Sequence, residues 1–185
     1  MTITLVMKLF SVYGSSNNTA NTHNSDTEPR KRAKPQTDFV PDSLDQSTLQ
    51  ILQPPTYATS QATQVINREL KAILKVQEST PLHELGWYIN RNMIQNVYQW
   101  IVELHSFDSD LPLSTDMKNA GIRSVVLELR FGNDFPVSPP FARVIRPRFL
   151  PFTVGGGGHV TGGGAMCMEL LTNSGKTKAA RLWCR

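Results

Sequence analysis

Between residues 59 and 77, apolar side chains recur at the spacing of one face of an α-helix. Thr59 or Ser60 can cap the start of this helix, because a hydroxyl oxygen accepts a hydrogen bond from the first backbone amides. The helix should end near Gln77, before Pro81. Its apolar face carries Val65, Ile66, Leu70, Ile73 and Leu74.

Further along the chain, the period changes to that of a β-strand. Residues 98–105 alternate between two sets of side chains, as a half-buried strand requires. One set is Tyr98, Trp100, Val102 and Leu104, and the other is Gln99, Ile101, Glu103 and His105. A second strand is predicted over residues 124–131 and a third over residues 141–145. A helix followed by an antiparallel meander predicts the α+β class, in a domain of residues 56–175.

The chain before this domain has a different composition. Residues 11–55 are rich in Ser, Thr, Asn, Asp and Pro, and such a segment buries too little apolar area to offset its chain entropy. We therefore expect residues 1–55 to be a disordered N-terminal region. The apolar residues 1–10 indicate a weak strand or a disordered start rather than a signal peptide. The basic cluster at residues 30–34 is either a nuclear import signal or, as we favour, a solvated charge run.

Charge and cysteine content exclude several classes of function. The net charge of +4 derives from the last ten residues, because basic and acidic residues balance before position 176. We therefore expect no nucleic acid among the partners and, since no apolar run approaches about 20 residues, no membrane. The chain has two cysteines, Cys167 and Cys184, which disfavours a disulfide scaffold and favours a reducing compartment, the cytoplasm or the nucleus.

The strongest candidate for chemistry is the run GGGGHVTGGGAMCMELL at residues 155–171. Its glycines permit sharp bends and close approach of a large partner, and the apolar residues after Cys167 can anchor the segment. This arrangement is typical of an exposed nucleophilic thiolate. His83 and His105 are expected to be surface or cross-strand residues, which disfavours a cysteine protease. Because His159, Cys167 and Cys184 lack zinc-site spacing, no metal site is predicted.

A stiff turn at residues 133–140 completes the motifs, since it holds three prolines. The order of elements resembles the core of ubiquitin-conjugating enzymes: a helix, a meander, the Phe-Pro-x-x-Pro-Pro turn and a Gly-x-x-Cys segment. The strings PLHELGWYI, VYQWIVELHSFD, SVVLELRFG and PPFARVIRPRFLPF look like the Q-type subgroup and its fungal relatives. The resemblance covers about residues 54–175.

The resemblance implies that Cys167 receives ubiquitin from an activating enzyme as a thioester and passes it to a lysine, without metal or organic cofactor. His159 stands where most of the family has a catalytic Asn, and it either hydrogen-bonds the oxyanion or orders the loop. The family meets activating enzymes and ubiquitin ligases through the first helix and the turn. The corresponding turn residues here are Phe135, Pro136, Val137, Pro139 and Pro140.

The sequence departs from the family pattern in two places. Val137 is smaller than the Phe of many relatives, so the anchoring contact with a ligase is expected to be weaker. After Gly175 the basic residues 176–185 stand where relatives continue into helices. We therefore expect an incomplete core with low stability and weak activity, and the alternative to ubiquitin transfer is an inactive variant that binds ubiquitin or a partner.

Overall fold

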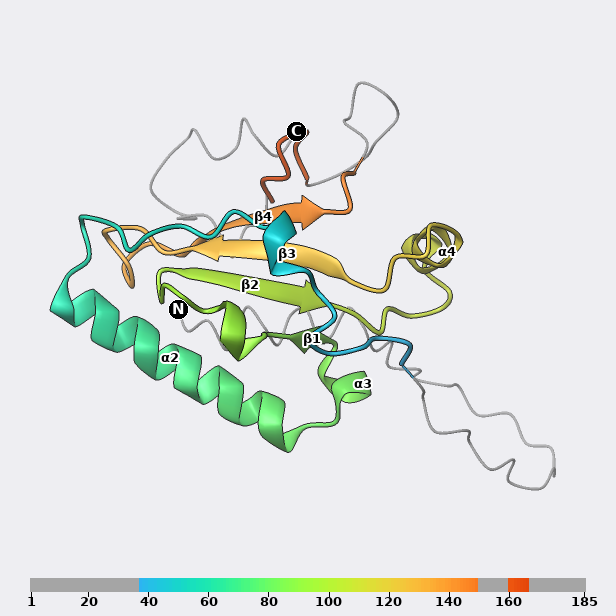
Figure 1. Ribbon diagram of the computed structural model, residues 1–185, viewed down its shortest axis with the longest axis horizontal. Helices are drawn as coiled ribbons and strands as arrows, with labels where there is room; N and C mark the ends of the chain where they lie inside the picture. Colours follow the sequence, from blue (N-terminus) through green and yellow to red (C-terminus); the bar gives the residue numbers. More distant parts are fainter. Residues whose placement is uncertain (1–36, 150–159, 167–185) are drawn as a thin grey trace, which may run out of the picture.

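The computed structural model describes residues 37–149 and 160–166, which form one sheet with helices around it (Figure 1). The sheet has four antiparallel strands in the order β1-β2-β3-β4. These are Trp87–Tyr88 (β1), Gln99–Leu104 (β2), Val125–Arg130 (β3) and Phe141–Arg146 (β4). The helices are Ser60–Ser79 (α2), Leu82–Leu85 (α3) and Pro112–Asn119 (α4), with 3-10 turns at Gln46–Thr48 (η1) and Arg91–Met93 (η2). The predicted α+β class is confirmed.

Helix α2 is the helix that the apolar period predicted. The Thr59 hydroxyl accepts a hydrogen bond from the backbone amide of Ala62 at 3.2 Å, which satisfies one donor of the first turn. The helix ends at Ser79 rather than near Gln77. Ile66, Leu70 and Ile73 are buried, while the flanking apolar residues pack at the edge of the core.

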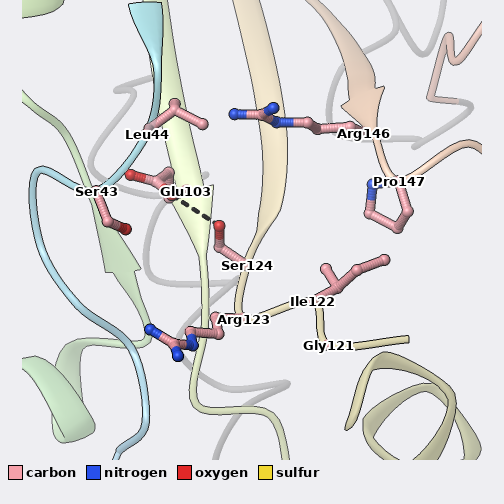
Figure 2. A pocket seen from close by; sticks show the side chains of 9 residues that line it. All are labelled: Ser43, Leu44, Glu103, Gly121, Ile122, Arg123, Ser124, Arg146 and Pro147. Carbon is pink, nitrogen blue, oxygen red and sulfur yellow. Dashed lines mark hydrogen bonds between the residues drawn. The ribbon is translucent and has the colours of Figure 1, made fainter. Parts of the chain in front are cut away.

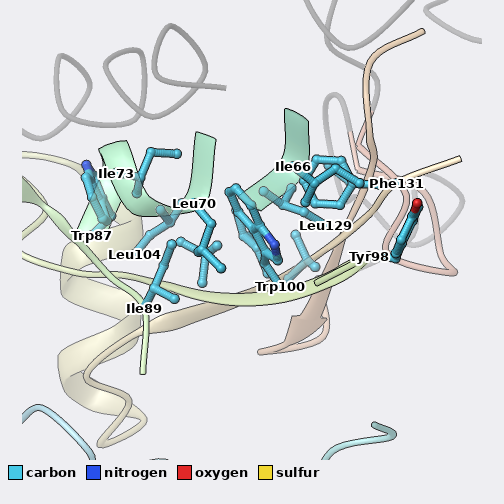
Figure 3. Packing of buried hydrophobic residues seen from close by; sticks show 14 of the residues in the cluster. Ile66, Leu70, Ile73, Trp87, Ile89, Tyr98, Trp100, Leu104, Leu129 and Phe131 are labelled. Atoms are coloured by element: carbon cyan, nitrogen blue, oxygen red, sulfur yellow. The ribbon is translucent and has the colours of Figure 1, made fainter. Parts of the chain in front are cut away.

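The core lies between α2 and the inner face of the sheet. Trp100 is fully buried at its centre, with its ring 4.8 Å from that of Phe131 (Figure 3). The Trp100 indole donates to the Val97 carbonyl at 2.8 Å, so this large side chain leaves no polar group unsatisfied. Strands β2 and β3 both contribute alternate residues to this face, because Trp100 pairs with Leu129 and Val102 with Leu127.

Three short elements show too little hydrophobic periodicity to be predicted from the sequence. β1 has only two residues and α3 only four, which is less than one full repeat of either pattern. Helix α4 has end signals instead of an apolar stripe: Pro112 begins it, and Gly121, with a φ of 67°, follows it. No helix in the part of the chain that the structure describes is long and apolar enough to cross a membrane.

The outer face of the sheet is covered by residues 37–53, which we call the strap. It is drawn in blue to teal in Figure 1 and passes over the sheet on its way to α2. The prediction of disorder up to residue 55 is therefore wrong for the strap, and residues 1–36 lie outside the described residues. The prediction that β2 is half-buried is also wrong, because all six of its residues are buried. Alternation identifies the polar face of a strand but not what covers it.

His105 is 1% exposed, which excludes the surface alternative predicted for it; the cross-strand alternative fits its backbone amide, which donates to the Gly86 carbonyl at 2.9 Å. It lies just beyond β2, and its ring stacks on Phe39 of the strap with centroids 4.0 Å apart. The imidazole Nδ1 is 2.8 Å from the Ser106 hydroxyl. Burial lowers the pKa of His105 to about 4, opposed in part by the Trp87 backbone.

We expect this histidine to make the fold sensitive to mild acid. Below pH 6.5 an unfolded His105 binds a proton that the folded protein excludes until about pH 4, so stability is lost as pH falls through this window. The slope is about 1.4 kcal/mol per pH unit, for one proton. Urea unfolding from pH 7 to pH 4.5 should show a steeper loss for the wild type than for His105→Phe, which retains a ring against Phe39.

The comparison at each pH isolates His105 from other groups, such as Glu103, whose pKa burial raises and which therefore acts in the opposite sense. His83→Gln is the control for the loss of a histidine at another position, because His83 lies half-buried in α3. Equal slopes for the wild type and His105→Phe would contradict the assignment.

Candidate active site

The residues before Cys167 form a tight hairpin against β4. Val160 bridges Met166, and the Thr161 amide donates to the Ala165 carbonyl at 2.9 Å. The Met166 amide donates to the Ala142 carbonyl at 3.1 Å, and the Val144 amide donates to the Gly164 carbonyl at 2.7 Å. Residues 164–166 therefore extend the sheet beyond β4 and share its rigid backbone.

Gly164 is the residue that allows this docking. Its φ is +86°, and a Cβ built on it would lie 2.1 Å from the Val144 carbonyl oxygen. Any side chain there would collide with backbone that cannot rotate away. The sequence predicts that the glycine run provides access and bending, and at position 164 glycine is required for the close approach of two main chains.

The two residues predicted to carry the chemistry, Cys167 and His159, lie outside the described residues. They flank in sequence the hairpin of residues 160–166, whose position on β4 is defined. Their roles stay predictions. The tail at residues 176–185 also lies outside the described part of the chain.

A buried carboxylate supports the sheet where the hairpin docks. Glu128 of β3 is fully buried and receives hydrogen bonds from Arg130, Arg143 and Gln99. Burial alone would raise its pKa, but these three donors together hold the pKa of Glu128 below its usual range. Arg143 is also the backbone partner of Ala165. The same residue therefore connects the hairpin to the charge network.

The proline turn divides into buried and exposed residues. Phe135 is buried with its ring centroid 5.0 Å from that of Phe131, and Pro140 is also buried. Pro136 and Val137 are exposed, Val137 at 87%, while Pro139 is half-buried. Of the five predicted contact residues, Phe135 and Pro140 therefore shape the turn, and Pro136 and Val137 form its accessible tip.

A basic stripe that was not predicted from the sequence lies on the exposed side of α2. Arg68, Lys71 and Lys75 are all exposed and follow one another at helical spacing of three and four residues. A shallow hollow with Leu70, Leu74 and Ile94 in its wall lies beside Lys71 and Lys75. The spacing of these three cations in the sequence indicates that they share one face of the helix. The net charge of the domain does not reveal this stripe, because acidic residues elsewhere balance it.

A cavity of about 330 Å³ lies on the opposite face, between the strap and the sheet (Figure 2). Glu103 borders it and accepts a hydrogen bond from the Ser124 hydroxyl at 2.7 Å. Arg123 and Arg146 also line this cavity. Among residues 37–149 and 160–166, no group of three or more His, Cys, Asp or Glu side chains could hold a metal ion.

Several curated proteins with related sequences are named ubiquitin-conjugating enzymes. Over 85 residues the chain is 44% identical to ubiquitin-conjugating enzyme E2 Q-like protein 1 of Mus musculus, covering 46% of this chain and 49% of the relative. It is 36% identical over 123 residues to ubiquitin-conjugating enzyme E2 Q1 of Mus musculus, covering 64% and 27%. It is 40% identical over 89 residues to ubiquitin-conjugating enzyme E2 25 of Caenorhabditis elegans, covering 46% and 21%.

The matches are strong in identity but partial in length. The chain spans about half the length of the first of these relatives and less of the other two. No protein-family model matches the chain.

Proposed function

Because the chain belongs to the ubiquitin-conjugating enzyme family, as a relative of its Q-type subgroup, we propose that Cys167 accepts ubiquitin as a thioester and transfers it to a lysine amine. The observation that carries this proposal is the hairpin of residues 160–166, which is bonded to β4 up to the residue before Cys167. A nucleophile needs a fixed backbone beside an accessible approach, and Met166 supplies the fixed backbone.

The chemistry is two acyl transfers. In the first, the Cys167 thiolate attacks the ubiquitin thioester on the activating enzyme; a new S–C bond forms, and the enzyme's cysteine leaves as a thiolate. In the second, a lysine amine attacks the Cys167 thioester; the amide C–N bond forms, the S–C bond breaks, Cys167 leaves as a thiolate, and the nitrogen loses a proton to solvent. Both steps pass through an oxyanion, and neither requires a metal.

His159 has two candidate roles, and they affect different steps. If it donates a hydrogen bond to the oxyanion of aminolysis, His159→Ala should slow lysine discharge by about 10²-fold and leave thioester formation intact. If it orders the loop, both rates should fall together. Single-turnover measurements of charging and of discharge to free lysine distinguish these roles.

Two exposed features support the proposed partners. The stripe of Arg68, Lys71 and Lys75 on α2 suits an acidic surface on the activating enzyme. Val137, at 87% exposure on the rigid tip of the proline turn, suits an apolar pocket on a ligase. Since valine is smaller than the phenylalanine of many relatives, we expect weaker binding to ligases that require the larger ring.

The test is an adduct assay with purified protein, ubiquitin, activating enzyme and ATP. A species heavier by one ubiquitin that disappears on reduction would support the proposal. If no reducible species forms, although the activating enzyme is charged, the proposal fails. The variant that binds ubiquitin or a partner without catalysis is then the function that remains.

A further inference from the structure

The outer face of the sheet has the side chains of an exposed surface, although it is covered. Its residues alternate with those of the core, and several are polar or charged: Gln99, Glu103, His105, Glu128, Arg130 and Arg143. The strap contacts Gln99 and His105 of this set, yet none of the strap residues belongs to the hydrophobic core cluster. This face and the strap therefore meet as two surfaces rather than as parts of one core.

Polar side chains on the sheet side bind backbone groups of the strap. The Gln99 side chain accepts a hydrogen bond from the Leu52 amide at 2.8 Å and donates to the Gln50 carbonyl at 2.9 Å. With these two bonds the Gln99 side chain provides one acceptor and one donor to the strap, as the backbone of a neighbouring strand would. Asn96 donates to the Gln53 carbonyl at 3.1 Å. Such contacts recognise an extended chain whatever its side chains are.

One aromatic residue anchors the other end of the strap. Phe39 is the one buried residue among strap residues 37–53. It stacks on His105 and lies 5.7 Å from Tyr88, ring centre to ring centre. Around it, the Tyr88 hydroxyl donates to Asp42 at 2.7 Å, and the Ser106 hydroxyl donates to Thr37 at 2.8 Å. Tyr88 and His105, both on the sheet side, form the slot for this aromatic side chain.

The interface between strap and sheet includes one open hollow. The cavity of about 330 Å³ between them is bordered by Ser43 and Leu44 of the strap and by Glu103 on β2 (Figure 2). This hollow is open to solvent, so part of the strap lies over the sheet without direct contact.

We propose that the outer face of the sheet is a binding site for an extended peptide segment with an aromatic anchor, and that the strap occupies it as an intramolecular ligand. A partner chain with such a segment would replace the strap in the Phe39 slot and on Gln99. The proposal is independent of the chemistry at Cys167. Because the strap is tethered, its effective concentration is high, and a free peptide competes only when the strap is weakened.

The test uses the full chain and a fluorescent peptide of residues 37–53. The Phe39→Ala chain should bind this peptide at least about tenfold more tightly than the wild-type chain, because its own strap has lost the anchor. A peptide carrying the same Phe39→Ala change should lose this binding. Val40→Ala is the matched control chain, since Val40 is adjacent but 45% exposed, and it should bind as the wild type does. Equal binding by the wild-type and Phe39→Ala chains would overturn the proposal.

Hydrogen exchange of the wild-type chain provides a test without any variant. If the strap is a replaceable ligand, the Leu52 amide should exchange at least about tenfold faster than the paired amides of β2, through local release of the strap. If the strap amides exchange at the same rate as the paired amides of β2, the strap is an integral part of the fold and the proposal is wrong. This result decides the question even if Phe39→Ala fails to fold.

Discussion

Replacement of Cys167 by serine is expected to abolish the reducible adduct with ubiquitin. A serine hydroxyl is hardly ionised near neutral pH and forms an oxygen ester that reducing agents do not cleave. Any adduct that persists in Cys167→Ser should therefore resist reduction, and Cys167→Ala should form none. The measurement is the adduct assay, run with and without reductant on the three proteins in parallel.

Cys184→Ser is the matched control, because Cys184 is the second of the two cysteines in the chain. It should form the reducible adduct at the wild-type rate. An adduct that is lost in Cys184→Ser and retained in Cys167→Ser would show that the glycine-rich segment is not the acceptor. The proposed assignment of the nucleophile would then be rejected, even though the chain would still carry ubiquitin.

The inner half of the fold was predictable because its sequence periods are long. α2 repeats its apolar face over 20 residues, and β2 and β3 each alternate over six. β1 and α4 offered no comparable repeat. The strap could not be predicted, since its composition is polar and its binding depends on partners distant in sequence, such as Gln99 opposite Leu52. A period describes one element and carries no information about which segment lies against it.

The chemistry of the candidate site stays a prediction, and the geometry of the residues around it could not be predicted from the sequence. A cysteine after a glycine run indicates a nucleophile, and the proline turn indicates a rigid contact surface. The division of that turn into a buried Phe135 and an exposed Val137 depends on the position of Phe131. Likewise, the requirement for glycine at position 164 follows from a contact with Val144 that only the fold creates.

The strap and the hairpin are each linked to the same buried carboxylate through one intervening residue. Glu128 bonds Gln99, which holds the strap at Leu52, and it also bonds Arg143, whose backbone pairs with Ala165 of the hairpin. Gln99 is one of the three donors to Glu128, and release of the strap would remove its bonds to Gln50 and Leu52. Contacts through Gln99, Glu128 and Arg143 thus connect the proposed peptide site to β4, the strand on which the hairpin docks.

Substitution of alanine for Gly164 is expected to slow thioester formation by at least about tenfold while the core stays folded. The new methyl would stand 2.1 Å from the Val144 carbonyl oxygen, so the hairpin must move away from β4. Cys167 is three residues further along, and displacement of a reacting group by about 1 Å can cost up to about 10²-fold in rate. The measurements are the charging rate and urea unfolding of the same preparation.

Two other glycines separate the collision from general effects of adding a methyl group. At Gly163 a Cβ would lie 3.9 Å from the Thr161 hydroxyl, an ordinary contact, so Gly163→Ala should charge at the wild-type rate. Gly121 has a φ of +67° and nothing within 4 Å, so Gly121→Ala measures backbone strain alone. It should lose about 1–2 kcal/mol of stability and retain its charging rate. If Gly164→Ala charges as fast as Gly163→Ala, the docking of the hairpin on β4 does not position the nucleophile.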